Sequence, residues 1–285
     1  MLIQSLVTII SMMLSLRQHL RNGGRSYGPL LLGDSPLTAE LLCLIGYDFV
    51  IVDHEHGPTN VRSGYAMLQA MDAAQSNTRP IVRIPAADSV YMKKVLDSMR
   101  LPAGVLVPMV DSAEMATAVV QSTRYPVGDK NKNENTYSNA IDGKRGCAAP
   151  LVRASGWGLS RQDYMRQASE DLLVMVQVET PQAIDEIPEI ANIPGIDGIF
   201  IGPLDLSASV GKMGQFDDPE VRALMDAAEQ AIRDADGVFL AGFRAPGRDL
   251  GEMFEAGYQL ICGSVDLGLL RQAAKADLAA AQEFL

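Results

Sequence analysis

The stretch that decides the fold is DFVIVDHEHGP, residues 48–58. Its first half is an unbroken apolar run, Phe49–Val52, rich in β-branched residues, which is typical of a strand buried on both faces of a parallel sheet. The run ends in four titratable side chains, Asp53–His56, before Gly-Pro turns the chain. A capped strand end with surface charges would explain this pattern less well than an active site, because α/β enzymes place their chemistry at the C-terminal ends of strands.

From residue 30 onward, short apolar runs alternate with amphipathic helical patterns. Among the helical patterns, one covers Pro36–Ile45 and ends at Gly46, a second begins at Thr180-Pro181, and a third covers Pro219–Asp234. The strand candidates are Leu30–Leu32, Phe49–Val52, Pro80–Ile84, Gly104–Val110, Leu172–Val178, Gly198–Ile201, Val238–Gly242 and Leu260–Cys262. This alternation predicts an α/β fold, a (β/α)8 TIM barrel. The rival, a doubly wound sheet, most often carries a Gly-rich phosphate turn, and neither GxGxxG nor a Walker A motif occurs.

We expect one domain over residues 17–285. The apolar segment 1–16 carries no charge, but it lacks the basic region and cleavage site of a signal peptide and is too short to span a bilayer comfortably. An over-extended N-terminus and a helix packed on the domain both remain open for it. Residues 127–144 are polar and without periodicity, so they are expected to form a loop inserted in the barrel.

Composition excludes several classes of protein. The net charge of the 285 residues is −11, and no basic patch of the kind that binds duplex nucleic acid is visible. The three cysteines are far apart and form no CxxC pair, which argues against a zinc site built on thiolates. The acidic balance suits a cytoplasmic enzyme but does not identify its substrate, and we expect neither a membrane nor a nucleic acid as partner.

Polar side chains gather where the predicted strands end. They are Asp53, Glu55 and His56 after the second strand, Arg83 in the third, Gln177 and Glu179 at the fifth, and Asp205 after the sixth. Charged residues that merely mark the starts of loops would explain any one of these but would explain the set poorly. In a barrel, all of these strand ends open onto one face.

The residue types at these positions suit catalysis at a metal ion. The carboxylates of Glu179 and Asp205 could share a divalent cation, although a salt bridge to an arginine would satisfy them equally. Arg83 could hold a substrate carboxylate or neutralise those two acids. His56 is the natural proton carrier. No lysine stands at a strand end in this cluster, which argues against a Schiff-base mechanism.

Several ordered motifs share one pattern. They are Asp53-x-Glu55-His56-x-Pro58, Val107-Pro108-Met109-Val110, Thr123-Arg124-Tyr125-Pro126, Gln177-Val178-Glu179 and Gly198-Ile199-Phe200-Ile201-Gly202-Pro203-x-Asp205-Leu206-Ser207. Over residues 17–275 the chain resembles the metal-dependent (class II) pyruvate aldolases of the HpcH/HpaI type. The resemblance implies a barrel of the phosphoenolpyruvate/pyruvate superfamily type.

The resemblance also implies roles for individual residues. Glu179 and Asp205 would ligate Mg²⁺, Mn²⁺ or Co²⁺, and Arg83 would contact the pyruvate oxygens. His56 would be the acid/base, oriented by Asp97. The remaining implied residues are Gln177, Gly202, Pro203 and Leu204 around the substrate, with Asp53 and Glu55 in support.

The implied reaction is aldol cleavage or formation of a 4-hydroxy-2-oxo acid, giving pyruvate and an aldehyde through a metal-stabilised pyruvate enolate. Another enolate reaction, such as oxaloacetate decarboxylation or C–C ligation, stays open, as does a non-catalytic barrel for ligand binding or assembly. The resemblance further implies a homohexamer whose C-terminal helix is exchanged between subunits, and the Ala-rich pattern over Leu267–Phe284 is compatible with it.

Three features depart from the family pattern. The segment 127–144 is longer than the usual connection. His54 stands where relatives often have a small or apolar residue, and Leu204 stands where alanine is common. We expect His54 to influence the aldehyde side of the pocket and Leu204 to alter the substrate pocket.

Overall fold

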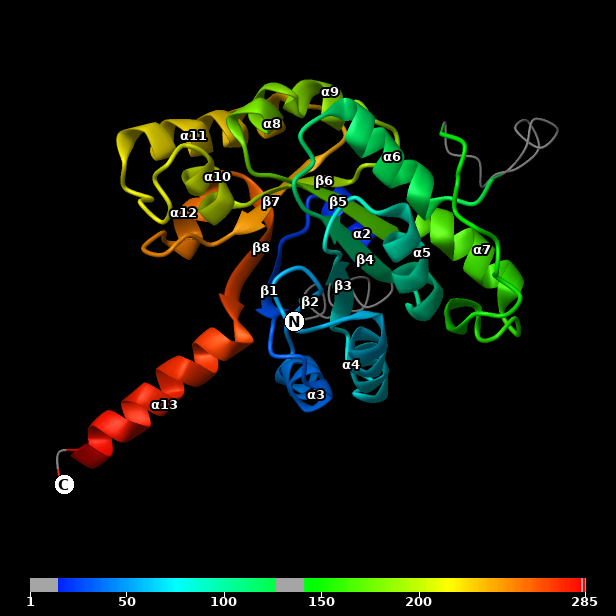
Figure 1. The fold of residues 1–285 in the computed structure, drawn as a ribbon, viewed down its shortest axis with the longest axis horizontal. Coiled ribbons are helices and arrows are strands. Elements are labelled where there is room, and N and C mark those ends of the chain that lie inside the picture. Colours follow the sequence, from blue (N-terminus) through cyan, green and yellow to red (C-terminus); the bar gives the residue numbers. More distant parts are fainter. Residues whose placement is uncertain (1–14, 127–140, 283, 285) are drawn as a thin grey trace, which may run out of the picture.

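The computed structural model describes residues 15–126, 141–282 and 284, and in this part of the chain eight parallel strands close into a barrel in the order β1 to β8 (Figure 1). The strands are β1 (Ser26–Leu31), β2 (Phe49–Asp53), β3 (Arg79–Arg83), β4 (Ala103–Val107), β5 (Leu172–Val178), β6 (Gly198–Ile201), β7 (Phe239–Phe243) and β8 (Tyr258–Val265). The predicted barrel is therefore confirmed, and the doubly wound alternative is wrong because β1 pairs with β8.

The described residues also form helices, most of which surround the barrel (Figure 1). They are α2 (Leu16–Arg21), α3 (Pro36–Ile45), α4 (Val61–Ala73), α5 (Ser89–Ser98), α6 (Ala113–Thr123), α7 (Arg161–Glu170), α8 (Pro181–Asp185), α9 (Ile187–Ala191), α10 (Pro203–Ser209), α11 (Pro219–Asp234), α12 (Leu250–Glu255) and α13 (Asp266–Gln282), with a 3-10 turn η2 (Arg153–Ser155) before α7. Local signals placed several of their ends. Thr180 caps α8 by accepting from the Ala183 N–H at 3.0 Å, and Gly46 ends α3 in the left-handed conformation.

Alternation along each strand divides the core into two layers. In β2, Phe49 and Ile51 face the barrel interior, whereas Val50 and Val52 face the surrounding helices. Because successive side chains of a strand point to opposite faces, Asp53 comes next on the interior side. The sequence of β2 thus places one buried carboxylate inside the mouth of the barrel.

The first and last strands along the chain, β1 and β8, are longer than predicted. β1 begins at Ser26 and β8 runs from Tyr258 to Val265, because the two strands pair with each other from Ser26↔Leu260 to Leu30↔Val265. Close packing requires a glycine in β1, since a Cβ at Gly28 would collide with the backbone of Phe49. The segment 1–14 and most of the predicted loop 127–144 lie outside the described residues.

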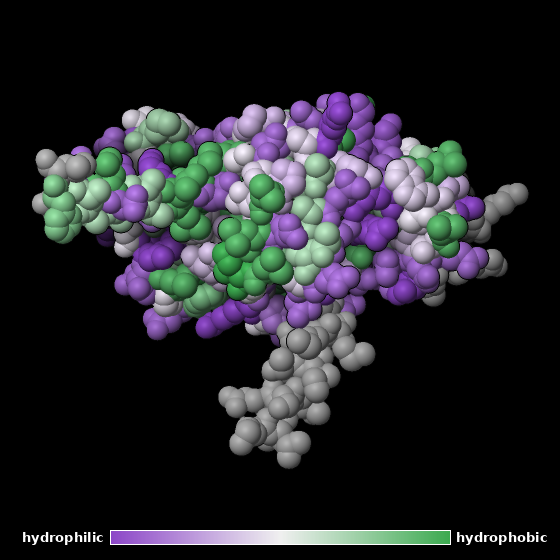
Figure 2. All heavy atoms as spheres, turned by 90° about the horizontal axis from the view of Figure 1, so that it is seen from below, coloured by the Kyte–Doolittle hydropathy of each residue, from purple (hydrophilic) through white to green (hydrophobic). Residues whose placement is uncertain are grey.

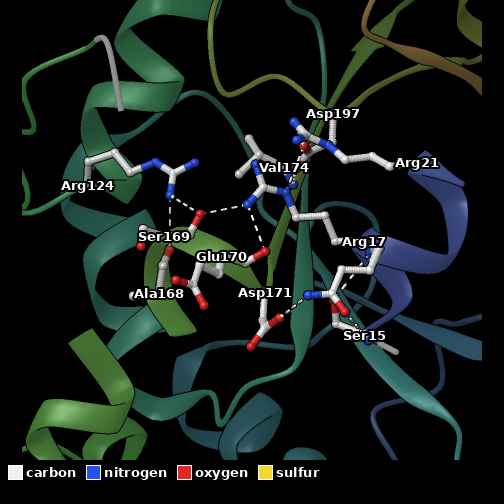
Figure 3. Close-up of polar contacts among 11 residues, drawn as sticks. Ser15, Arg17, Arg21, Arg124, Ala168, Ser169, Glu170, Asp171, Val174 and Asp197 are labelled. Carbon is white, nitrogen blue, oxygen red and sulfur yellow. Dashed lines mark hydrogen bonds and ion pairs between the residues drawn. The ribbon is translucent and has the colours of Figure 1, made fainter. Parts of the chain in front are cut away.

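Helix α2 packs Leu16 and Leu20 into the inner core of the barrel, and Figure 3 shows its polar contacts. Arg17 Nε and Arg21 Nη2 reach the fully buried carboxylate of Asp197 at 2.8 and 2.6 Å. The second oxygen of Asp197 accepts from the Val174 N–H at 2.9 Å, at the start of β5. Arg17 and Arg124 both donate to the Ser169 carbonyl near the end of α7, where cations suit the helix dipole. This network fixes α2, which the sequence did not single out, against α7 and against Asp197 directly before β6.

Helix α13 extends from β8 away from the barrel (Figure 1). Of its described side chains only Asp266 is buried, and Leu267, Leu270 and Leu278 are exposed. A second apolar surface lies on α3, and Figure 2 shows apolar side chains gathered over both helices. The exchange of α13 between subunits stays a prediction. Within the described residues no helix combines the length and apolarity that a membrane crossing requires.

Candidate active site

Arg83 is the best-anchored side chain at the mouth of the barrel. Its Nε and Nη2 donate to the two oxygens of Asp53, each at 2.8 Å, and its Nη1 lies 3.0 Å from Glu55 Oε2. Burial alone would lower the pKa of Arg83, but the carboxylates of Asp53, Glu55 and Glu179 raise it. The sequence left open whether Arg83 neutralises Glu179 or Asp205, and the structure shows that its hydrogen-bonded partner is Asp53.

Asp53 also shapes the turn that follows β2. Its oxygens accept from the backbone N–H groups of Glu55 at 3.1 Å and His56 at 3.4 Å. Asp53 is fully buried, and the sheet register sets it directly beside Arg83. One carboxylate therefore holds both the arginine and the turn that carries the histidine, and its supporting role in catalysis stays a prediction.

Glu179 is held at the end of β5. Its Oε2 accepts from the Met109 N–H at 2.9 Å, and its Oε1 accepts from Gln177 Nε2. Burial raises the pKa of Glu179 to about 7, the charges of Asp205 and Glu55 add to the rise, and the two hydrogen bonds oppose it. Gly202 lies so close beside it that a Cβ there would displace the Glu179 carboxylate and the Gln177 amide.

The two other acids of the mouth come from different elements. Asp205 lies half-buried in the first turn of α10, with Gly202 and Pro203 before it and the exposed Leu204 beside it. Burial raises the pKa of Glu55, and the charges of Asp53 and Asp205 raise it further against the opposing charges of Arg83 and His56. The predicted acids are thus brought within electrostatic range of one another.

These residues offer part of a metal site. No group of three His, Cys, Asp or Glu side chains in the described ranges has the arrangement of a complete site. Glu179 and Asp205 nevertheless supply the hard oxygen donors that Mg²⁺ and Mn²⁺ prefer. Gln177 Oε1 is buried beside them without a hydrogen-bond partner. An unmatched buried oxygen and repelling carboxylates are what a divalent cation would relieve, so the residues present fit the implied metal.

His56 stands at the rim of the mouth. Its side chain is 56 % exposed, and its Nε2 lies 3.6 Å from Glu55 Oε2. Asp97 instead accepts from Arg145 Nη2 at 2.7 Å, and no hydrogen bond or ion pair joins it to His56 in the part of the chain described. Asp97 is near the end of α5, which runs back from the mouth after β3. The described chain therefore brings Glu55 to His56, and the orienting role of Asp97 stays a prediction.

The side chain of His54, directly after β2, points away from the barrel interior toward the surrounding helices. Its ring is buried against Gly64 of α4, and its Nδ1 lies 3.0 Å from the Tyr91 hydroxyl of α5. Burial lowers the pKa of His54 to about 4, which keeps the ring neutral. The imidazole packs between β2 and the helices α4 and α5. No described contact joins it to the mouth of the barrel, so its influence on the aldehyde side of the pocket stays a prediction.

Sequence reasoning missed one residue of the mouth. The Arg83 guanidinium carbon lies 5.3 Å from the centre of the Phe243 ring, and that ring meets Phe200 edge to face at 4.8 Å. Alternation from Phe239 and Ala241, both in the inner core, could have placed Phe243 on the interior side. Its aromatic side chain was not recognised because only polar groups were sought at the strand ends.

A closed parallel barrel with acids and an arginine converging at the carboxyl ends of its strands is the architecture of a barrel enzyme. The profile of the HpcH/HpaI aldolase/citrate lyase family matches residues 27–273. The chain belongs to this family and is a carbon–carbon lyase.

Individual relatives agree with this assignment. A 4-hydroxy-2-oxo-heptane-1,7-dioate aldolase from Escherichia coli ATCC 8739 is 37% identical over 89% of this chain and 89% of its own. A 2-keto-3-deoxy-L-rhamnonate aldolase from Escherichia coli O9:H4 is 35% identical over 90% of this chain and 89% of its own. The crystal structure of a HpcH/HpaI aldolase/citrate lyase family protein from Burkholderia cenocepacia J2315 has a TM-score of 0.84 at 34% identity, covering 94% of this chain and 98% of that one.

Proposed function

We propose that the protein is a metal-dependent aldolase that cleaves or forms a 4-hydroxy-2-oxo acid, with pyruvate and an aldehyde as the other side of the reaction. The observation that carries the proposal is Arg83, held by Asp53 at the mouth of the barrel, where the charges of Glu179 and Asp205 influence each other. Two relatives that are aldolases of larger oxo acids support the reaction class.

Glu179 and Asp205 would hold the divalent cation, with Gln177 beside them. When bound, the cation would supply Lewis-acid stabilisation of the negative charge that develops on the oxygens of the pyruvate portion. The protein contributes by holding the metal-binding carboxylate in a fixed orientation. Glu179 is aimed by the Met109 N–H and Gln177, so its carboxylate does not need to reorganise when a cation or substrate arrives.

Arg83 would bind the carboxylate of the 2-oxo acid. Asp53 takes the Nε and Nη2 side of the guanidinium, whereas Nη1 lies 3.0 Å from Glu55 Oε2 without a hydrogen bond to it. The N–H groups at this end of the guanidinium could therefore donate to a substrate oxygen. Gly202, Pro203 and Leu204 would line the opposite side, where the first turn of α10 begins. The side chain of Leu204 would then face the part of the substrate that differs among aldolases.

His56 would take the proton from the 4-hydroxyl during cleavage and return it during condensation. Its exposed place at the rim suits a base that must exchange protons with solvent. The carboxylate of Glu55 lies 3.6 Å from Nε2 and is the acidic group beside the ring in the described residues.

Pyruvate release from 4-hydroxy-2-oxo acids tests this proposal. Protein stripped with a chelator should be inactive and regain activity with Mg²⁺, Mn²⁺ or Co²⁺. Glu179→Gln and Asp205→Asn should lose at least about a hundredfold in kcat/KM, because each removes a charged ligand. Glu189→Gln, an exposed acid on α9, is the matched control and should behave as the parent. If Glu179→Gln retained metal-dependent cleavage, Glu179 would not be a metal ligand. If the parent protein turned over oxaloacetate faster than hydroxy-oxo acids, the reaction would be decarboxylation instead of aldol cleavage.

We also expect a homo-oligomer, with the hexamer as the predicted form. Exposed leucines lie on α3 and α13, and contiguous apolar surface is typical of protein–protein interfaces. Light scattering on the eluting protein gives the mass directly, and a monomer at micromolar concentration would contradict the expectation.

A further inference from the structure

Phe243 lies across the barrel from the strand that carries Arg83. In a closed ring of eight strands, β3 and β7 are separated by three strands on either side, so they face each other. The guanidinium carbon of Arg83 is nevertheless only 5.3 Å from the centre of the Phe243 ring. The arginine therefore reaches across the mouth and ends against the aromatic ring of the opposite wall.

The contacts of Arg83 fix its guanidinium group in two ways. Asp53 holds the group in its own plane through two parallel hydrogen bonds, and Glu55 lies at the other nitrogen. Neither carboxylate prevents the guanidinium plane from rotating about the axis along which its hydrogen bonds to Asp53 run. The Phe243 ring sits over the guanidinium carbon, where a π-face attracts a cation, and so opposes that tilt.

The Phe243 ring is itself held in place. It meets the fully buried Phe200 ring of β6 edge to face, with centres 4.8 Å apart and planes at 79°. Phe243 is only partly buried, because it ends β7 at the open mouth. Phe200 therefore supports the Phe243 ring on its inner side, and the ring's outer part borders the mouth through which substrate would enter.

We propose that Phe243 is a positioning residue: its ring sets the tilt of the Arg83 guanidinium so that the free end of the group meets the carboxylate of a small 2-oxo acid. This inference rests on the proposed function, because it takes Arg83 as the group that binds the substrate carboxylate. It adds a residue that the polar pattern of the sequence does not reveal. Phe243 acts on binding through Arg83.

Variants that keep or remove the π-face separate this role from simple packing. Phe243→Leu keeps an apolar side chain against Phe200 but removes the ring, whereas Phe243→Tyr keeps the ring. The assay is exchange of the pyruvate methyl protons in D₂O with Mg²⁺, followed by NMR over a range of pyruvate concentrations. Phe243→Leu should raise the pyruvate KM about 5- to 30-fold, with kcat changed by less than about threefold. Phe243→Tyr should restore KM to within about threefold of the parent.

The outcomes distinguish this inference from the proposed function. A KM within about twofold of the parent in Phe243→Leu, or the same rise in both variants, overturns the positioning role. If Phe243→Leu does not fold, Phe243→Met takes its place, because it also lacks a π-face and adapts to irregular space. Arg83→Lys is measured in parallel. If it leaves the pyruvate KM unchanged, the proposed binding of substrate at Arg83 fails; if it raises KM while Phe243→Leu does not, only the role of Phe243 fails.

Discussion

Replacing Asp53 by asparagine tests the arrangement on which the site depends. Asparagine has the same shape but no charge, and one of its two arms must present N–H groups toward the Arg83 guanidinium, which only donates. Asp53 is fully buried and Arg83 is 3 % exposed, so water cannot replace the lost partner. We expect Asp53→Asn to weaken both the folded state and the binding of a 2-oxo acid.

The magnitude follows from the contacts. Asp53 accepts two charge-assisted hydrogen bonds at 2.8 Å, and removing one partner of a buried ion pair costs about 3–5 kcal/mol of unfolding free energy. For 285 residues the unfolding entropy is about 0.6 kcal/mol per kelvin. The variant should therefore melt about 5–8 °C below the parent.

Thermal and urea unfolding measure the loss of stability, and pyruvate proton exchange measures the loss of binding. Glu55→Gln is the matched control, because Glu55 is 15 % exposed and contacts Arg83 at one nitrogen only. It should lower the melting temperature by less than half as much. If Asp53→Asn melted within about 2 °C of the parent and kept its pyruvate KM, the buried Asp53–Arg83 pair would not be the anchor of the site.

Further predictions concern other parts of the molecule. The raised pKa of Glu179, about 7, means that the folded state holds a proton which the unfolded state releases; in metal-free protein, stability should fall as pH rises from 4.5 to 7, and Glu179→Gln should flatten this slope in urea titrations. Asp197→Asn should cost about 3–5 kcal/mol in urea unfolding, whereas Arg21→Gln, at a side chain 47 % exposed, should cost less than about 1 kcal/mol. Gly64→Ala should destabilise by about 1–3 kcal/mol because its Cβ meets the His54 ring, and adding His54→Ala should recover part of the loss; purely additive losses would refute the contact.

Much of the fold follows from short-range patterns in the sequence. The apolar run of β2, the Thr180-Pro181 start of α8 and the Gly46 end of α3 each depend on neighbouring residues, so local physics places them. The ends of β1 and β8 were not predicted, because pairing between distant strands decides them. The same limit applies to α2, which is fixed by Asp197 far along the chain.

The site divides in the same way. Residues at the ends of strands, such as Arg83 and Glu179, could be assigned to the mouth from their position in the alternating pattern. Their partners could not, because the sequence does not say which acid Arg83 binds or that Asp97 pairs with Arg145. Phe243 was missed for a further reason: it meets Arg83 across the barrel, at a range that no spacing along the chain encodes.

The seam between β1 and β8 has a consequence for how the chain reaches this state. Ser26 pairs with Leu260, so β1 cannot pair with β8 until residues up to about 260 have been synthesised. Contacts of such sequence separation form slowly, because a long loop must close before they stabilise anything. Until then, β1 and the most recently formed strand each carry an unpaired edge open to other chains. During synthesis, the nascent barrel is therefore most exposed to misassembly just before β8 emerges, and variants that weaken this seam should lower the yield of folded protein more than its activity once folded.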